Sequence, residues 1–324
     1  MGSDSDRRAT ESTPAVFFSV IIPAYNCAHL IGETIASVYA QEFTDYEVVI
    51  VNDGSTDSTA DVLSGYEASS GGRIRVISQQ NKGEGGGRNA GIFEARGRYL
   101  TFLDQDDLWF PWTLKTYFQV LSRHNFPALL VGSGQEFTGD ASTLCLHESP
   151  VIEKHYDDFF SLARLPYLPT GTPGTVVRSD EARRVGGLSE ARVIGIDQEF
   201  YYKLGDAKGL VFVSAPLTVA IRRHAGNLQK NTAMAAQGAL FLIRNEKEGT
   251  YPGGRVRAWE RRLLMARLVR TISLQCLKTG HFAEAWAIYR QTILWHLRLC
   301  RIRYLVGFPL TYVLERLRKD GKEE

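Results

Sequence analysis

Short runs of apolar residues recur along the first third of the chain, and each has the length of a β-strand. Stretches with apolar side chains at helical spacing separate them. Strands that alternate with helices build a mostly parallel sheet with helices on both faces, so the pattern predicts an α/β fold. The predicted strands span residues 17–25, 46–53, 73–79 and 98–104, and the predicted helices span residues 30–40, 58–68 and 88–95.

The pattern continues less regularly after the fourth strand. Residues 111–124 begin with proline, a favoured first helical residue, and predict a helix. Residues 136–175 hold several prolines and glycines, and we expect them to form irregular loops that shape a substrate site. The apolar run 209–221 is rich in valine and interrupted by Pro216, so it predicts strand rather than a membrane-spanning helix.

Three regions follow from this pattern. The polar residues 1–15 form a disordered leader, since they lack the apolar core of a signal peptide. Residues 16–250 form the α/β domain, which ends in the turn-rich segment 249–254. Residues 251–324 form a basic helical region, in which two helices are joined at Thr279 and Gly280.

Three carboxylates, Asp104, Asp106 and Asp107, follow the fourth predicted strand within four positions. Like charges this close need a cation or hydrogen-bond donors to compensate them. Asp-x-Asp on one loop can hold an oxygen-preferring divalent cation together with diphosphate oxygens. A helix N-cap explains Asp107 but not all three. An EF-hand is excluded, because its required glycine and glutamate fall on Trp109 and Lys115.

Two further segments lie beside predicted strand ends. Asp53 follows the second strand and is placed either to cap a turn and helix or to accept hydrogen bonds from a base or a ribose. Residues 81–92 combine glycines with Lys82 and Arg88, and flexible backbone beside cations suits phosphate contacts. Their likeness to a dinucleotide fingerprint is discounted, since that motif follows the first strand of its fold.

Taken together, four motifs in this order resemble the family-2 glycosyltransferases of the GT-A fold. The resemblance covers residues 17–230, including an acceptor-side segment at 170–204 and an Arg-x-His-type loop at 221–229. It implies a GT-A type nucleotide-binding mixed sheet flanked by helices, with a C-terminal helical tail. The motifs are Pro23-Ala24-Tyr25-Asn26, Asn52-Asp53-Gly54-Ser55-Thr56-Asp57, Asn81-Lys82-Gly83 with Arg88-Asn89-Ala90-Gly91, and Phe102 to Asp107.

What the resemblance implies is inverting transfer of a sugar from a nucleoside diphosphate donor, usually UDP, to a hydroxyl acceptor. The enzyme would be a metal-dependent, hexosyltransferase-type glycosyltransferase. In this interpretation Asp106, helped by Asp104, binds Mn²⁺ or Mg²⁺ on the diphosphate. The nucleotide-sugar is held by Pro23, Ala24, Tyr25, Asn26, Asp53, Lys82, Gly83, Arg88, Asp104 and Gln105.

The same resemblance implies a catalytic base. Asp197 would deprotonate the acceptor hydroxyl as it attacks the anomeric carbon. Many relatives have Glu-Asp where this chain has Ile196-Asp197, so Glu199 is the alternative base, and a carboxylate stabilising a helix N-terminus is the structural alternative for it. His224 is placed either to contact the metal or the diphosphate or to serve as an ordinary packed residue.

Composition bears on location and partners. The cysteines Cys27, Cys145, Cys276 and Cys300 have no zinc or disulfide spacing, which suits a reducing compartment. Residues 255–324 hold 15 Lys and Arg against 6 Asp and Glu, whereas the rest of the chain is acidic. No nucleic-acid recognition motif accompanies this basic tail, so nucleic acid is not expected as a partner.

A membrane is the other partner that the tail suggests. Trp295, Tyr304, Phe308 and Tyr312 lie among arginines, as on an anionic membrane surface, while a solvated helix bundle is the alternative. We therefore expect a cytoplasmic protein, peripheral on the inner face of the membrane if the tail binds lipid. Its acceptor would be a glycan or a lipid-linked glycan of cell-envelope polysaccharide or glycolipid synthesis.

Two other functions remain open from sequence. A sugar nucleotidyltransferase also joins nucleotide, metal and sugar, but it would carry a glycine-rich basic loop directly after the first strand, where this chain has "PAYNCAHL". A non-catalytic nucleotide- or glycan-binding module would need no base, and the presence of both Asp106 and Asp197 argues against it.

Overall fold

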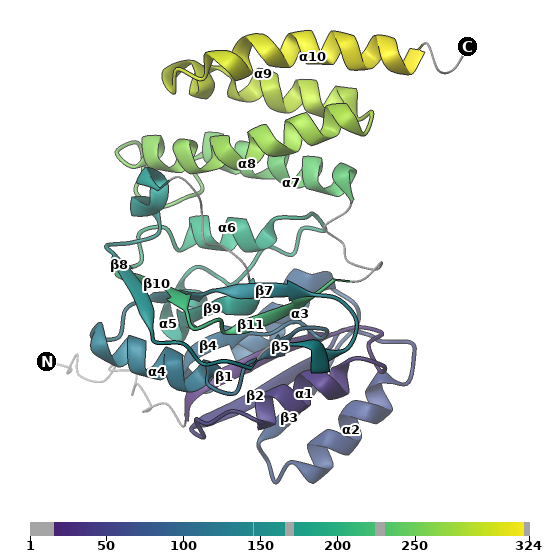
Figure 1. Cartoon of the computed structure of the whole chain (residues 1–324), viewed down its shortest axis with the longest axis vertical. Helices are drawn as coiled ribbons and strands as arrows, with labels where there is room; N and C mark the ends of the chain where they lie inside the picture. Colours follow the sequence, from purple (N-terminus) through teal and green to yellow (C-terminus); the bar gives the residue numbers. More distant parts are fainter. Residues whose placement is uncertain (1–15, 145, 166–171, 224–230, 321–324) are drawn as a thin grey trace, which may run out of the picture.

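The computed structural model describes residues 16–144, 146–165, 172–223 and 231–320. Its centre is an eight-stranded mixed sheet in the order β3-β2-β1-β4-β9-β6-β10-β8, accompanied by a three-stranded sheet, β5-β11-β7 (Figure 1). The strands are β1 (Val16–Ala24), β2 (Tyr46–Asn52), β3 (Ile74–Ser78), β4 (Gly97–Phe102), β5 (Leu108–Trp109), β6 (Leu129–Gly132), β7 (Gly134–Phe137), β8 (Ile152–Tyr156), β9 (Thr175–Arg178), β10 (Leu210–Ala215) and β11 (Val219–Arg222).

Helices cover the sheet and then stack beyond it. In Figure 1, α6 lies between the sheet and the layers formed by α7 to α10. The helices are α1 (Ile31–Tyr39), α2 (Thr59–Ser69), α3 (Gly83–Glu94), α4 (Thr113–Arg123), α5 (Ser179–Arg184), α6 (Ile196–Lys203), α7 (Thr232–Glu248), α8 (Ala258–Lys278), α9 (Phe282–Arg298) and α10 (Ile302–Asp320), with short 3₁₀ turns at Ala141–Thr143, Phe160–Arg164 and Thr172–Gly174.

The strand β1 shows why the first apolar runs lack alternation. It pairs in parallel with β2 on one side and β4 on the other. Phe18, Val20 and Ile22 enter the core on one face of the sheet, and Ile21 enters the core on the other. A strand buried on both faces needs apolar residues at successive positions. The four predicted strands and their helices are confirmed.

Antiparallel strands complete the sheet. β9 lies between β4 and β6 and is antiparallel to both, and β8 is an antiparallel edge strand on β10. The expectation of irregular loops over 136–175 was therefore wrong for Ile152–Tyr156, which is strand, and for Phe160–Arg164, which packs in the core. The sequence pattern did not show β8, because three of its five residues, Glu153, Lys154 and His155, are polar and its side chains are mostly exposed.

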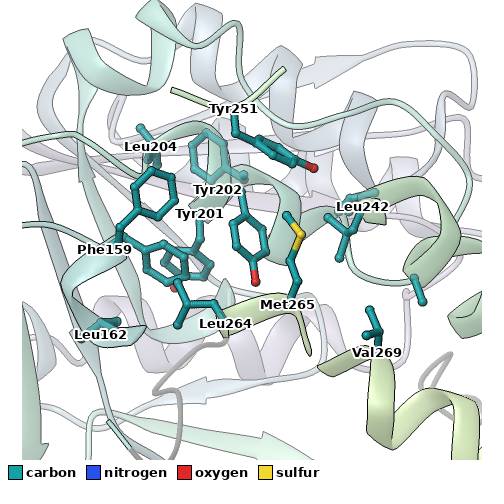
Figure 2. Close-up of a cluster of buried hydrophobic side chains, with 14 of the residues drawn as sticks. Phe159, Leu162, Tyr201, Tyr202, Leu204, Leu242, Tyr251, Leu264, Met265 and Val269 are labelled. Atoms are coloured by element: carbon teal, nitrogen blue, oxygen red, sulfur yellow. The ribbon is translucent and has the colours of Figure 1, made fainter. Parts of the chain in front are cut away.

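One hydrophobic core joins the sheet to the helical layers. It runs from Ile21 and Phe102 on the sheet to Phe308 on α10 without a break. Figure 2 shows its middle part, where Tyr201 and Tyr202 of α6 lie between Phe159 and the α8 side chains. The Phe159 and Tyr201 rings stack with centroids 5.2 Å apart.

Ion pairs and a fixed turn reinforce this junction. Arg261 of α8 binds Glu246 of α7 at 2.6 Å, and both side chains are buried. Arg257 binds Asp158 at 2.8 Å. The turn at 249–254 is held by Arg261, which donates to the carbonyls of Pro252 and Gly254. This segment is thus a packed connection, and Gly280 ends α8 at the predicted junction with a φ of +80°.

The tail differs from the sequence expectation in one respect. Trp295, Tyr304 and Phe308 were proposed for a membrane surface, but their exposed fractions are 7%, 6% and 1%. They fill the interior between α8, α9 and α10, where Tyr289 stacks on Phe308 at 4.4 Å. Among the residues that the structure describes, no helix combines the length and apolar character needed to cross a bilayer.

Gly238 of α7 packs against the turn before α6, so we expect that a larger residue at this position destabilises the protein. A Cβ built on Gly238 would lie 1.8 Å from the Ile194 carbonyl oxygen, which is backbone and cannot rotate away. We expect Gly238→Ala to lower the free energy of unfolding by roughly 1–3 kcal/mol, even though alanine favours helix. The matched control, Gly65→Ala in α2, meets nothing within 4 Å and should be neutral or stabilising. Urea denaturation followed by circular dichroism compares them, and equal effects would contradict this packing.

The buried His296 predicts a pH dependence of stability. Its exposed fraction is 0%, and neither ring nitrogen has a hydrogen-bond partner among the described residues. Burial, with Arg301 and Arg270 nearby, lowers the pKa of His296 from 6.5 to about 4. The unfolded chain therefore binds more protons than the folded chain between these values, and stability falls as pH drops from 6.5 to 4.

We expect His296 to account for about 3 kcal/mol of this loss. His296→Phe keeps an aromatic ring beside Tyr304, which lies 4.4 Å away, and removes the titration. The difference in unfolding free energy between wild type and variant should change across this pH window and be constant above pH 7. A constant difference at every pH would contradict the prediction.

Candidate active site

The loops that follow β1, β2 and β4 meet at one edge of the sheet. These strands are adjacent and parallel, so their carboxyl ends lie together, which is where ligands bind in such sheets. The Tyr25 backbone N–H donates to Gln105 Oε1 at 2.6 Å, and Gln105 Nε2 donates back to the Tyr25 carbonyl. The Thr56 N–H donates to Asn26 Oδ1 at 2.8 Å. Three of the predicted segments are therefore connected directly.

Asp53 holds the start of α3. Its carboxylate accepts from Gln79 Nε2 at 2.7 Å, from the Lys82 N–H at 2.9 Å and from the Gly83 N–H at 2.8 Å. Its exposed fraction is 4%. Asp53 thus stabilises the positive end of this helix from a neighbouring strand. The predicted role of Asp53 at a base or ribose stays a prediction.

The glycines before Arg88 are helical, which corrects the expectation of flexible backbone at this segment. α3 begins at Gly83, five residues earlier than the predicted helix. A Cβ on Gly85 would lie 2.0 Å from the Ser189 carbonyl oxygen, and one on Gly91 would lie 2.4 Å from Ile21. Close packing, rather than flexibility, explains the run of glycines.

Arg88 lies beneath the acidic loop. Its side chain is 1% exposed, and it donates to Asp104 at 2.5 Å and to Glu84. Burial by itself would lower the Arg88 pKa, but the two carboxylates outweigh burial and raise it. Arg88 is therefore a permanent cation that fixes Asp104. The predicted role of Arg88 at the phosphates is left as a prediction, and in this structure its partners are carboxylates.

Asp107 is held from the other side by Arg222. The Arg222 backbone N–H donates to Asp107 Oδ1 at 2.9 Å. The Arg222 guanidinium donates to the Asp106 carbonyl, to the Gly139 carbonyl and to Glu33 of α1. Burial, and then the negative charge of Asp104, raises the pKa of Asp107 to about 8. The acidic loop is thus rich in negative charge that a cation would stabilise.

Asp197 lies in the first turn of α6 and faces the same charges. Burial raises its pKa, Glu84 raises it further and Arg88 opposes this. The preceding residue, Ile196, packs against α3, where a Cβ on Gly85 would lie 3.3 Å from its Cδ1 atom. Its Oδ1 accepts from the Gln198 N–H at 2.8 Å.

Glu199 points elsewhere. It is 3% exposed, and burial raises its pKa while Lys203 and the Ser189 backbone lower it. No interaction with Arg88 or Glu84 accompanies these effects. The choice between Asp197 and Glu199 as the base stays a prediction.

Other predicted residues complete the edge. Pro23 and Ala24 are the last residues of β1, and Tyr25 is 45% exposed beyond them. Lys82 is exposed immediately before α3. His224 lies outside the described residues, although Arg222 and Arg223 bring the chain to Asp106 and Asp107 just before it. The roles assigned to these residues are not tested by the structure.

Two contributors were missed from sequence. Glu84 binds Arg88 four residues later on α3, a spacing that could have indicated the pair. Glu33 binds Arg222 at 2.5 Å across 189 residues of sequence, and no local signal reveals such a contact. Both carboxylates belong to the network that holds the acidic loop.

The acidic loop suits a divalent cation shared with a ligand. Within the described ranges, no three His, Cys, Asp or Glu side chains gather as a complete metal site. Mg²⁺ is commonly bound by only one or two carboxylates plus substrate phosphates, and Mn²⁺ also prefers oxygen ligands. Asp104 and Asp106 are partly exposed and offer such oxygens, so the donor set fits.

Residues 19–158 match the family model described as Glycosyl transferase family 2. An uncharacterized glycosyltransferase of Nostoc sp. is 44% identical over 102 residues, which are 32% of this chain and 32% of that protein. The UDP-Glc:alpha-D-GlcNAc-diphosphoundecaprenol beta-1,3-glucosyltransferase WfaP of Escherichia coli is 40% identical over 94 residues, 28% of this chain and 36% of that one. The aligned part covers less than two thirds of the first curated relatives, from 19% to 66% of their length.

Solved structures show the same fold. Residues 1–349 of Staphylococcus aureus TarS in complex with UDP align over 94% of this chain and 92% of that one, with a TM-score of 0.58 and 19% identity. The mannosyltransferase PcManGT of Pyrobaculum calidifontis, in complex with GDP-Man and Mn²⁺, aligns over 93% and 87%, with a TM-score of 0.52 and 18% identity. These likenesses confirm the predicted GT-A type sheet with C-terminal helices. Residues 19–158, which carry the predicted motifs, are thus similar to glycosyl transferase family 2.

Proposed function

We propose that the protein transfers a sugar from a UDP-sugar donor to a hydroxyl group of a glycan or lipid-linked acceptor. The observation that carries this proposal is that Asp53 and the Arg88–Asp104 pair meet at one sheet edge, with the start of α6, which carries Asp197, packed against α3. The UDP bound by TarS and the UDP-Glc named for the Escherichia coli relative support UDP as the nucleotide.

The donor occupies the edge between the β1 and β4 loops in this proposal. Residues 23–26 and the Asp53 carboxylate hold the base and ribose, with Tyr25 as the exposed aromatic face. Lys82 is exposed just before α3 and offers an ammonium group to the phosphates, while Gly83, whose N–H is held by Asp53, fixes the backbone beside it. Arg88 acts through Asp104, whose position it fixes, and Gln105 fixes the Tyr25 backbone.

Asp104 and Asp106 would hold Mn²⁺ or Mg²⁺ together with diphosphate oxygens. When bound, such a cation offsets the negative charge that grows on the departing diphosphate. His224 is the remaining proposed ligand. The Mn²⁺ of the PcManGT complex supports a divalent cation here.

Asp197 is the proposed base. Its carboxylate accepts the proton of the acceptor hydroxyl as that oxygen bonds to the anomeric carbon. The bond from this carbon to the diphosphate breaks on the opposite face, so configuration inverts and UDP leaves. A pKa raised by burial brings a carboxylate closer to neutral pH, where a base is most effective.

A relative supports the proposed acceptor class. The name of the Escherichia coli protein specifies an acceptor linked to diphosphoundecaprenol, which is a lipid. We propose a lipid-linked acceptor and a peripheral location on the inner membrane face for this protein as well.

Calorimetric titration tests the donor site. We expect UDP to bind in the presence of Mn²⁺ and to bind at least about tenfold more weakly without it, because the carboxylates otherwise repel the diphosphate. GDP and dTDP should bind more weakly than UDP. Asp106→Ala should remove the effect of Mn²⁺, while Asp61→Ala on the exposed face of α2 should leave it intact. Absence of binding by every nucleotide would overturn the proposed function.

Replacement of Asp197 tests the base separately from binding. We expect Asp197→Asn to reduce kcat by roughly 10²- to 10⁴-fold with a UDP-sugar donor. The affinity for UDP and Mn²⁺ should stay within about twofold, since the base contacts the acceptor. Glu199→Gln is the matched control and should keep most of the activity in protein shown to be folded. The reverse pattern would assign the base to Glu199.

A further inference from the structure

The outer face of α10 is apolar along most of its length. Tyr304 and Phe308 point inward and are buried. The opposite side of the helix carries six apolar side chains whose exposed fractions lie between 54% and 68%. They recur at the spacing of one helical face. These residues, the α10 stripe, are Ile302, Val306, Leu310, Val313, Leu314 and Leu317.

The α10 stripe lies where nothing described covers it. α10 is the outermost helical layer, at the end of the molecule farthest from β1 to β3 (Figure 1). From its first to its last residue the stripe extends about 22 Å along the helix. Soluble proteins seldom expose a continuous apolar patch of this kind unless a partner or a membrane occupies it.

Positive charge surrounds the stripe. Arg303, Arg316, Arg318 and Lys319 are exposed on the same helix. The acidic group described there, Glu315, is already paired with Arg318 at 3.0 Å. An apolar face with a basic border is the pattern of a helix that lies in the surface of an anionic membrane.

The same character continues on α9. Leu294 and Leu297 are 68% and 52% exposed, and Trp286 is 40% exposed. The Trp286 ring contacts Tyr312 of α10 at 5.3 Å, so this side of α9 adjoins α10. Apolar surface is therefore shared between the last two helices.

A basic groove borders the Leu294 side of α9. It has a volume of about 500 Å³ and is lined by Leu294 and Trp295 together with four cations, Lys247, Arg262, Arg290 and Arg298. Arg262 pairs with Glu246, whereas Arg290 and Arg298 form no ion pair with a described residue. Burial, and then the charge of Arg290, lowers the pKa of Lys247. A groove with cations and an apolar wall suits a phosphate group attached to a lipid.

We infer that the outer surface of α9 and α10 docks on an anionic membrane, with α10 lying in the plane of the interface. The α10 stripe enters the acyl boundary, and the surrounding arginines and the basic groove contact lipid phosphates. This inference deepens the peripheral location given under the proposed function by naming the surface that docks, and it does not depend on glycosyl transfer itself.

A second copy of the chain fits this surface less well. Pairing two α10 stripes would bring the arginine borders of one copy against those of the other. Like charges held together across an interface cost free energy, and Glu315 is already engaged with Arg318. Negatively charged lipids compensate the whole border at once.

Vesicle flotation of the full chain tests the inference. Vesicles of phosphatidylcholine alone are compared with vesicles containing about one third phosphatidylglycerol, at low and high ionic strength. The test variant combines Val306→Gln, Leu310→Gln and Leu317→Gln. The matched control combines Leu146→Gln, Ile152→Gln and Val256→Gln, which are apolar residues outside α9 and α10 that are at least as exposed as two of the three test residues.

We expect wild type and control to bind the anionic vesicles, and to bind them more weakly at high salt. The partition coefficient of the test variant should be lower by about tenfold or more. Failure of wild type to bind anionic vesicles overturns the inference, as does equal binding by the test variant. A wild-type dimer that the test variant converts to monomer, without vesicle binding, assigns the stripe to a second copy instead. Binding of UDP and Mn²⁺, measured on the same samples, reports on the proposed function separately.

Discussion

The candidate active site depends on a buried positive charge, Arg88, that lies against the negatively charged loop Asp104–Asp107. Arg88 is almost wholly buried and holds Asp104 on one side and Glu84 on the other. Arg222 approaches the same loop from β11 and holds Asp107 through its backbone. Without these two arginines, three aspartates at one strand end would repel each other in a partly dehydrated site. With them, the loop is ordered and still rich in negative charge.

The α3 helix adjoins both the proposed metal loop and the proposed base. Arg88 of α3 binds Asp104 in the loop after β4. The charges of Arg88 and Glu84 also act on the pKa of Asp197 in α6, which Glu84 raises and Arg88 lowers. α3 and the chain before α6 approach so closely that Gly85 has no room for a side chain beside Ser189. The relative position of the proposed base and the proposed metal loop is therefore set by backbone packing rather than by flexible side chains.

The sequence predicted the features that local pattern controls. The β1 to β4 strands, their loops and the Asp cluster were all evident, because runs of buried residues and strand-end carboxylates are visible within a few positions. It did not reveal that the glycines before Arg88 are helical, since the reason is contact with Ser189 across the fold. Nor could it show Glu33 beside Arg222, or which tail aromatics are buried. Each of these depends on residues distant in sequence.

The shared core has a consequence for how the molecule unfolds. Because Ile21, Tyr202, Met265 and Phe308 belong to one continuous cluster, the sheet and the helical layers lose their interior together. The buried Arg261–Glu246 pair lies at this junction and is costly to break from either side. The chain should therefore melt in one cooperative transition. The side chains in Figure 2 come from both sides of residue 250, so separating the chain there would leave two fragments that each expose their part of this core.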